Sequence, residues 1–365
     1  MSSKGTMKST VNLIGENVNT KRVTIPIPTP AAHQVLIKIV VSGSNPKDWK
    51  MPVFQAEGKI PIPKGPDAEG INQGDDIAGI VEAVGDGVLE FKPGDRVASF
   101  HEMQSAGGSY AEYGIGWDHT TFHLPDSVSF EEAATIPLAA LTATVALHHN
   151  LKLPTPWTPA TESIPFVLYG ASTAVGAFAI KLLRNSNIHP IIAIAGKSQQ
   201  YVEKLLDRSK GDAVFDYRHG SDEVIRQIQD HLKAGGFSQP RYGIDPGIGK
   251  SSQQVLTTIV AKDGNINLVM PSDTDVGTAN KTITSVGVVH NMEDGRYGAD
   301  ASDLGLATCR WFTRALQRGN FEGHPYEVRP GGLDAVQQAL KDLKDGKNSA
   351  LKYVFRIADT PGLST

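Results

Sequence analysis

The chain has 365 residues, 40% of them hydrophobic and 20% charged, which is enough apolar material for a large core and predicts two domains. The formal net charge of −4 at pH 7 gives no electrostatic reason to expect nucleic acid or an anionic membrane as a partner. The one cysteine, Cys309, excludes an internal disulfide, and no run reaches the roughly 18 apolar residues of a membrane span. Because the first residues lack the apolar core of a secretory signal, we expect a cytoplasmic protein.

The N-terminal part of the chain alternates strand-like segments with turn signals. Strands are expected at Val35–Val41, Asp76–Val84 and Asp95–Phe100, and turns that contain glycine or proline separate them. This pattern is typical of a mostly β domain. A connector with three prolines, Pro154–Pro159, leads into a second region.

The stretch Phe166–Leu183 carries the most information about function. Its first four residues form an apolar run that fits a buried parallel strand, and a turn flanked by Gly170 and Gly176 follows. Apolar residues then recur with helical spacing at Val175, Phe178, Ala179, Leu182 and Leu183. Amides at the start of such a helix attract anions, and glycines let the backbone approach a pyrophosphate closely. The stretch therefore predicts a dinucleotide site, with a plain strand-to-helix turn as the alternative because Thr173 replaces the middle glycine of the usual loop.

More strand and helix units follow the glycine turn. Apolar strands are expected at Pro190–Ala195, at Ala213–Tyr217 and, as the sixth strand, at Thr282–Val289. Repeated units of this kind imply a parallel sheet with right-handed crossovers, and hence an α/β fold with a doubly wound sheet. Two segments depart from the usual apolar pattern, Arg241–Asp245 in the fourth strand and Asn265–Asn267 in the fifth. They are consistent with a divergent pocket or with a changed reaction.

The residues after the second of these strands indicate which nicotinamide cofactor is used. An acidic residue at that place accepts hydrogen bonds from the adenosine ribose, but this chain has Gly196, Lys197 and Ser198. An ammonium and a hydroxyl suit a 2′-phosphate, and a charge-assisted hydrogen bond contributes about 1.5–3 kcal/mol. We therefore expect NADPH rather than NADH, with a solvated loop lysine as the alternative for Lys197.

Motifs spread over nearly the whole chain resemble those of the medium-chain dehydrogenase/reductases and occur in the same order. They are Asn45–Lys50, Gly85–Val88 with Phe91–Val97, Gly108–Tyr113, Ala133–Pro137 with Leu141–Ala143, and the turn at Gly170. The chain is most similar to the zinc-independent branch, which includes quinone oxidoreductases and fungal trans-acting enoyl reductases. Zinc-dependent relatives have a cysteine where Asn45 stands and Gly-His-Glu where Gly74–Asp76 stands, so we expect no metal.

The resemblance implies a GroES-like β domain formed by residues 1–138 and 309–365, a Rossmann domain formed by residues 139–308, and a substrate cleft between them. It also implies the residues that contact the cofactor. These residues contact the phosphates, the nicotinamide or the 2′-phosphate of the cofactor. They are Gly170, Ser172, Thr173, Ala174, Val175, Thr142, Met270, Lys197, Ser198, Tyr217 and Lys352. Packing, capping or solvation is the alternative role for Tyr217, Thr142 and Lys352.

Without a metal, the chemistry that best suits NADPH is hydride addition to a carbon–carbon double bond conjugated with a carbonyl. Hydrogen bonds from the protein stabilise the enolate that forms, and a proton reaches the α carbon. By resemblance to the fungal enzymes, Lys50 is the leading catalytic donor and Asn45 positions the nicotinamide ribose or the substrate. A surface lysine and an ordinary turn residue are the alternatives, and Tyr110 and Tyr113 are weaker donor candidates.

The favoured function is an NADPH-dependent reductase of enones or enoyl thioesters that acts in trans beside a fungal polyketide synthase or its carrier protein. The nearest alternative is an NADPH-dependent quinone oxidoreductase. An alternative of another class is a scaffold or regulatory protein that binds NADPH without turnover. The oligomeric state is either a monomer or a homodimer. In this superfamily the sixth strand commonly forms a dimer edge, whereas fungal enoyl reductases can be monomers.

Overall fold

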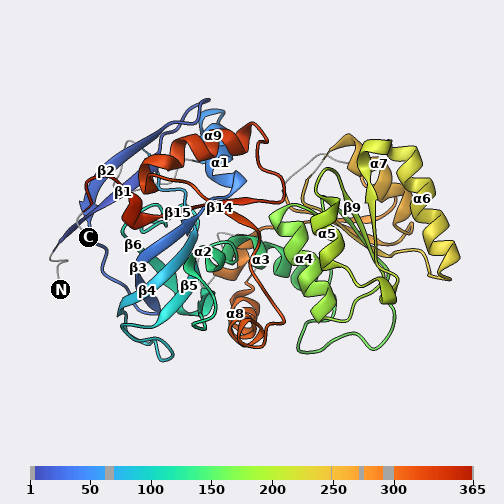
Figure 1. Ribbon diagram of the computed structural model, residues 1–365, viewed down its shortest axis with the longest axis horizontal. Coiled ribbons are helices and arrows are strands. Elements are labelled where there is room, and N and C mark those ends of the chain that lie inside the picture. The colour runs from blue at the N-terminus through green and yellow to red at the C-terminus, as the bar shows by residue number, and fades with distance from the viewer. Residues whose placement is uncertain (1–4, 62–69, 248, 271–274, 291–299, 364–365) are drawn as a thin grey trace. The chain divides into compact units, whose positions relative to one another are not determined.

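The computed structural model describes residues 5–61, 70–247, 249–270, 275–290 and 300–363. The chain forms two compact units, which Figure 1 shows with their elements labelled. The first unit comprises Met1–Leu138 and Gly287–Thr365, and the second comprises Ala139–Val286. The N-terminal and C-terminal parts of the chain therefore belong to one unit, and the middle of the chain forms the other.

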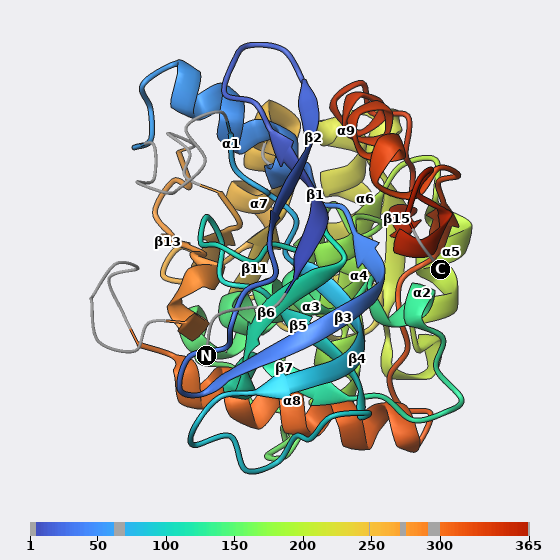
Figure 2. The same ribbon diagram turned by 90° about the vertical axis from the view of Figure 1, so that its left-hand side faces the viewer.

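The first unit is built on a mixed sheet in the order β14-β15-β3-β4-β5-β7, with β6 pairing with β3. Figure 2 shows β3 and β4 side by side in this sheet, and Ile37 and Ile77 on these strands are fully buried. A separate antiparallel pair is formed by β1 (Thr6–Asn12) and β2 (Thr20–Pro26). The strands of the main sheet are β3 (Gln34–Gly43), β4 (Asp76–Val84), β5 (Arg96–Phe100), β6 (Tyr113–Trp117), β7 (Thr121–His123), β14 (Tyr326–Val328) and β15 (Lys352–Arg356). The mostly β character expected for this part is confirmed.

Two helices, α1 (Pro46–Ala56) and α9 (Val336–Lys344), pack against each other in the first unit. Asn45 caps α1, because the Asp48 carboxylate accepts a hydrogen bond of 2.7 Å from the Asn45 backbone N–H. Proline occupies the first helical position, where an amide would have no helical acceptor. Trp49 of α1 packs on the same buried apolar cluster as Leu340 of α9, so the two helices share one core.

The helix α8 (Ser302–Gln317) also belongs to the first unit, although the family resemblance implied that residues 302–308 belong to the Rossmann domain. Phe312 of α8 packs against Phe122 of β7 with ring centroids 5.4 Å apart, and Arg310 donates to the Thr121 carbonyl at 2.8 Å. These contacts join residues that are about 190 positions apart in the sequence and leave no trace in local periodicity. The chain thus returns to the first unit at Gly287 rather than at residue 309.

The second unit contains a parallel sheet in the order β10-β9-β8-β11-β12-β13. This is the order of a doubly wound dinucleotide-binding sheet, and it reverses between β8 and β11. The strands are β8 (Phe166–Tyr169), β9 (Ile191–Ala195), β10 (Ala213–Asp216), β11 (Tyr242–Asp245), β12 (Asn265–Leu268) and β13 (Asn280–Ile283). The α/β fold class predicted from the sequence is confirmed.

Helices cover both faces of this sheet, with α4 (Ala174–Asn185) and α5 (Gln199–Leu205) on one face and α6 (Ser221–Ala234) and α7 (Lys250–Ile259) on the other (Figure 1). The helix α4 begins after Thr173, whose hydroxyl accepts a hydrogen bond of 3.0 Å from the Gly176 N–H. Its apolar face is at most 1% exposed at Phe178, Ala179, Leu182 and Leu183. The helical periodicity predicted for this segment is therefore confirmed.

The polar residues that depart from the usual apolar pattern in the fourth and fifth strands have hydrogen-bond partners in or next to the sheet. Asn267 of β12 is fully buried, donates to Thr282 Oγ1 at 3.0 Å and accepts from Thr284 Oγ1 at 2.7 Å. Asp245 at the end of β11 accepts a hydrogen bond of 2.9 Å from the Gly247 N–H. These polar side chains are thus accommodated by local hydrogen bonds, and the sheet continues through both strands.

The sixth strand was predicted at Thr282–Val289, and this prediction is wrong in its second half. Strand β13 ends at Ile283, where its pairing with Leu268 of β12 also ends, and Val286–His290 is a 3-10 helix. Val289 is fully buried there beside Gly305 of α8. Val289 is therefore buried by packing in the first unit, and not by a longer strand.

Residues Phe130–Asn150 form a helical run of 21 residues that is long and apolar enough to cross a membrane, although the sequence pattern had indicated no such run. It combines α2 (Phe130–Ala133), α3 (Pro137–Thr144) and a π-helix (Val145–Asn150). Since 83% of its most apolar window is buried within the structure, the run has the burial of a core helix.

Candidate functional site

The glycine turn lies at the carboxyl end of β8, where the strand order of the second unit reverses. Gly170 has a φ of +72°, a backbone conformation that favours glycine, and a Cβ there would lie 3.6 Å from the backbone nitrogen of Gly247. The ends of β8 and β11 are therefore close together. In doubly wound sheets this is the place where ligands bind.

The turn leads into the N-terminus of α4, which can receive a phosphate. A Cβ on Gly176 would lie 2.4 Å from the Gly170 carbonyl oxygen, so only glycine allows the helix to start this close to the strand. Thr173 caps the helix, and Ala174 and Val175 follow in the first turn, whose amides have no acceptor within the helix. Ser172 lies in the same turn and is partly exposed. The five predicted phosphate residues are thus brought together at one helix terminus.

The predicted 2′-phosphate residues lie after two neighbouring strands. Ala195 of β9 pairs with Asp216 of β10, so Lys197 and Ser198 after one strand are near Tyr217 after the other. Lys197 is exposed, and Tyr217 is 44% exposed and stacks on Tyr169 with centroids 6.0 Å apart. A Cβ on Gly196 would lie 2.7 Å from the Tyr217 ring, so this ring lies flat against the backbone.

Asp216, the last residue of β10, places an acidic side chain near the predicted 2′-phosphate residues, but an arginine neutralises its charge. Arg218 Nε donates to both Asp216 oxygens at 2.9 and 3.0 Å, and Arg218 Nη2 donates to Oδ2 at 2.5 Å. The hydrogen bonds from Arg218 lower the pKa of Asp216 to about 2. At the ends of β9 and β10 the net charge therefore does not oppose a phosphate.

Three other predicted cofactor residues lie elsewhere. Thr142 is buried on α3, and Met270 follows β12 at the carboxyl edge of the sheet, partly buried. Lys352 belongs to the first unit and is 4% exposed. Pro271, the residue after Met270, lies outside the described residues.

Lys352 and Asn45 meet in a buried polar cluster of the first unit. Lys352 Nζ forms an ion pair with the Asp76 carboxylate and donates to Asn45 Oδ1 at 3.1 Å and to the Thr135 carbonyl at 3.3 Å. Asn45 Nδ2 donates to Asp76 Oδ2 at 2.7 Å. An ammonium has three hydrogens, so that of Lys352 is fully engaged here. The contact of Lys352 with cofactor phosphates stays a prediction, and the structure shows a lysine that orients the Asn45 amide.

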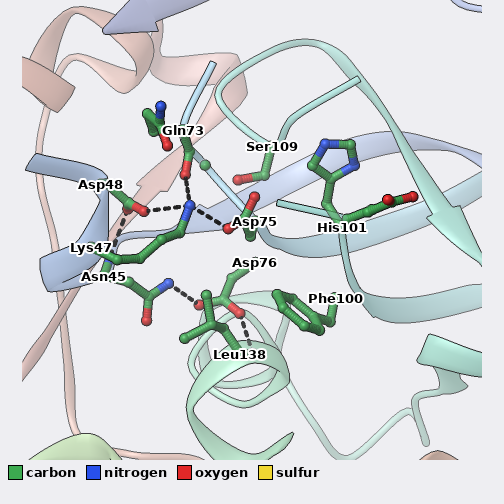
Figure 3. Close-up of polar contacts among 12 residues, drawn as sticks. Asn45, Lys47, Asp48, Gln73, Asp75, Asp76, Phe100, His101, Ser109 and Leu138 are labelled. Carbon is green, nitrogen blue, oxygen red and sulfur yellow. Dashed lines mark hydrogen bonds and ion pairs between the residues drawn. The ribbon is translucent and has the colours of Figure 1, made fainter. Parts of the chain in front are cut away.

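A second lysine, Lys47, which the sequence analysis did not single out, lies beside this pair. Figure 3 shows Lys47 reaching between Asp48, Gln73 and Asp75, with Asn45 reaching to Asp76. Lys47 Nζ forms an ion pair with Asp75, lies 3.2 Å from Asp48 Oδ1 and donates to the Gln73 carbonyl at 2.6 Å. Asp48, Asp75 and Asp76 are fully buried. In the sequence, the two adjacent acidic residues at the start of the apolar strand β4 are unusual, and they could have indicated this buried cluster.

Tyr110 also belongs to the buried cluster. Its hydroxyl donates to Asp48 Oδ2 at 2.5 Å, and its side chain is fully buried. Burial and the Asp48 carboxylate raise the pKa of Tyr110 well above its usual value. The phenol is therefore engaged inside the first unit and does not fit the weaker role of proton donor considered for it.

Lys50 lies on α1 one turn beyond Lys47 and is partly exposed. Its ammonium lies 5.6 Å from the centre of the Trp49 ring, within the range of a cation–π contact. Partial burial lowers the pKa of Lys50 below 10.5. A lysine with a lowered pKa releases its proton more readily than a fully solvated one, which suits a proton donor.

Two carboxylates in the cluster face a single ammonium. Burial raises the pKa of Asp75 to about 7 and that of Asp48 to about 6, against their attraction to Lys47. Burial alone would lower the pKa of Lys47, but Asp75 and Asp48 outweigh it and raise that pKa. The cluster therefore gives up protons near neutral pH while Lys47 stays charged.

Among the residues that the structure describes, no group of three or more histidine, cysteine, aspartate or glutamate side chains could hold a metal ion. His148, His119 and His123 each have a carbonyl partner instead, for example His119 with the Val289 carbonyl at 2.9 Å. The absence of a metal from the working enzyme stays a prediction.

We expect the Asp75→Asn variant to change how stability depends on pH. The folded pKa of Asp75 lies above its unfolded value, so its contribution to stability is present below pH 4 and is lost as the pH rises through about 7. Urea unfolding of both proteins from pH 5 to pH 8 checks this. The free energy of unfolding should fall less steeply with pH in the variant, by up to about 1.4 kcal/mol per pH unit. Equal slopes would contradict the assignment.

Comparisons with known proteins agree with this architecture. Residues 31–126 match the family model of the alcohol dehydrogenase GroES-like domain. The structure of the crotonyl-CoA carboxylase/reductase AntE in complex with NADP superposes with a TM-score of 0.69 and 16% identity, covering 96% of this chain and 94% of that one. At this identity the likeness shows the fold alone.

Two curated relatives are similar along most of their length. The trans-enoyl reductase fsr4 of Gibberella fujikuroi is 41% identical over 332 residues, which cover 89% of this chain and 91% of the relative. The trans-enoyl reductase resD of Aspergillus sclerotiorum is 31% identical over 360 residues, covering 91% of this chain and 95% of the relative. With the fold and the glycine turn, these similarities establish that the chain is an oxidoreductase of the medium-chain dehydrogenase/reductase family, related to the fungal trans-enoyl reductases.

Proposed function

We propose that this protein uses NADPH to reduce the carbon–carbon double bond of an enoyl thioester. The observation that carries the proposal is the 41% identity to a trans-enoyl reductase over 89% of the chain. The relatives' names indicate a reductase that works in trans, and a polyketide carrier protein is the partner that would present such a thioester.

The ends of β9 and β10 support NADPH over NADH. Lys197 and Ser198 offer an ammonium and a hydroxyl where NAD-dependent proteins use an acid, and the nearby Asp216 is neutralised by Arg218. The exposed face of Tyr217 lies beside them. The turn at Gly170 and the start of α4 would hold the pyrophosphate, because the positive φ of Gly170 and the close backbone contact at Gly176 both favour glycine.

Bound NADPH would supply a hydride to the β carbon of the substrate. The chain itself must then stabilise negative charge on the thioester oxygen and deliver a proton to the α carbon. Lys50 suits this task because it is partly exposed and its pKa is lowered by burial. Lys47, Lys352 and Tyr110 do not suit it, because their hydrogens are bonded inside the buried cluster.

Asn45 has a supporting role in this proposal. Its carbonyl oxygen accepts from Lys352 and its amide nitrogen donates to Asp76, which fixes the orientation of the side-chain amide. One of the two hydrogens on Nδ2 serves Asp76, and the other can serve a ribose or substrate oxygen. Asn45 thus orders polar contacts at the start of the helix that carries Lys50.

The proposed function is tested by NADPH oxidation with an enoyl pantetheine thioester, a simple enone and a quinone. We expect turnover with the thioester and the enone, because both carry a double bond conjugated with a carbonyl. Turnover with the quinone alone would support a quinone oxidoreductase. Tight NADPH binding without turnover of any of the three would support a scaffold protein and contradict the proposal.

We expect the Lys197→Ala variant to bind NADPH about tenfold to a hundredfold more weakly, since it loses a charge-assisted hydrogen bond worth about 1.5–3 kcal/mol. Its affinity for NADH should not change. Fluorescence titration with both cofactors measures this, and Lys210→Ala is the control because this exposed lysine precedes the opposite, amino end of β10. An equal loss for both cofactors would argue against a 2′-phosphate contact.

We expect Lys50→Met to lower kcat for the enoyl thioester by about a hundredfold or more, which is the range for removal of a general acid. The dissociation constant of NADPH should stay the same. The matched control is Lys59→Met, because Lys59 also lies over an aromatic ring, 5.4 Å from the centre of Phe54. A kcat equal to that of the wild type would remove Lys50 from the mechanism.

A further inference from the structure

The start of α1 is tied to the start of β4 by two parallel contacts. Asn45, the cap of α1, donates to Asp76, the first residue of β4. Lys47, in the first turn, pairs with Asp75, the residue just before that strand. Figure 3 shows both contacts running in the same direction between the two elements. The first turn of α1 is thus held at two points against one strand end.

These two contacts have different consequences for the helix. The Asn45 contact and the Asp48 cap fix where α1 begins. Lys47 lies in the first turn, and its ammonium is held by Asp48 of the same turn and by Asp75 and the Gln73 carbonyl outside the helix. A charged group with three fixed acceptors resists rotation of the helix about its axis.

Lys50 lies three residues after Lys47, so the two side chains are about 60° apart around the helix axis. On the far side of Lys50, Trp49 packs on the core beside α9, and Lys344 of α9 lies 5.7 Å from the centre of the same ring. Lys50 is therefore framed by an ion-paired side chain on one side and a packed aromatic ring on the other. A small rotation of α1 would displace its ammonium.

We infer that the Lys47–Asp75 ion pair is a positioning element that fixes the rotation of α1 and thereby holds Lys50 in place for the reaction. This inference rests on the proposed role of Lys50 as the proton donor. Neither side chain is proposed to touch a reacting group, because Asp75 is fully buried and the Lys47 ammonium is held by Asp75, Asp48 and the Gln73 carbonyl. The pair acts through the backbone of α1.

The test uses the full chain with the variants Lys47→Met, Lys47→Arg and the double variant Lys47→Met with Asp75→Asn. The double variant removes the pair and neutralises Asp75, and Asp48 keeps its hydrogen bonds from the Asn45 N–H and the Tyr110 hydroxyl. It therefore leaves less unpaired buried charge than Lys47→Met and keeps the test valid if that variant does not fold. Lys344→Met is the control, because it removes a cation near Trp49 but leaves the ion pair intact. Activity is measured at pH 8 with the enoyl pantetheine thioester.

We expect kcat to fall about tenfold to a hundredfold in Lys47→Met and in the double variant, as for a catalytic group displaced by about 1 Å. The dissociation constant of NADPH should stay that of the wild type, and Lys47→Arg should keep most of the activity because it retains a buried cation. Lys344→Met should behave as the wild type. A wild-type kcat in the double variant would overturn the inference.

A second measurement separates this inference from the proposed function. The pH dependence of Lys50 acetylation, followed by peptide mass spectrometry, gives the pKa of Lys50 whether or not the protein reduces the thioester. In the double variant we expect this pKa to rise toward 10.5, because a rotated helix exposes Lys50 to solvent. An unchanged titration of Lys50 would refute the positioning role even if Lys50→Met proves inactive. If the pKa of Lys50 shifts in the double variant but Lys50→Met is fully active, the ion pair does position Lys50, but Lys50 is not the proton donor.

Discussion

Two adjacent carboxylates at the start of β4 are the constraint on which the first unit depends. Asp75 and Asp76 are both fully buried, and a buried charge is tolerated only when it is paired. Asp75 pairs with Lys47 from α1, and Asp76 pairs with Lys352 from β15. Removing one partner of such a pair typically costs about 3–5 kcal/mol. The pairs therefore join a helix near the N-terminus, a central strand and the C-terminal strand at one point.

This arrangement explains why four polar residues close together in sequence have different roles. Asn45 and Asp48 define the start of α1, Lys47 joins it to β4, and Lys50 is left on a partly exposed part of the helix. In the second unit, the positive φ of Gly170 and the close backbone contact at Gly176 have a comparable effect, because they fix the start of α4 beside a strand end. In both units, the residues proposed to act on substrate or cofactor follow a rigidly held helix terminus or strand end.

Much of the second unit could be predicted because its signals are local. The strand Phe166–Tyr169, the turn and the apolar face of α4 are encoded within 18 consecutive residues, and the strand order follows from repeated units. The sixth strand was predicted too long because Val289 is buried in a 3-10 helix beside Gly305 of α8, and local periodicity does not reveal such packing. The ion pairs of Lys47 and Lys352 with Asp75 and Asp76 were not predicted for the same reason. Lys352 contacts Asn45 across 307 positions, and no short motif encodes such a contact.

The most direct test of the account is the fate of isotopes during reduction of an enoyl pantetheine thioester. The protein is supplied with NADPH deuterated at C4 of the nicotinamide, in each of the two stereoisomers, and the product is analysed by NMR. We predict deuterium on the β carbon from one stereoisomer only and a solvent-derived hydrogen on the α carbon, because a lysine ammonium exchanges its protons with water. Deuterium on the α carbon, or a saturated product that contains no deuterium from either stereoisomer, would contradict hydride addition followed by protonation.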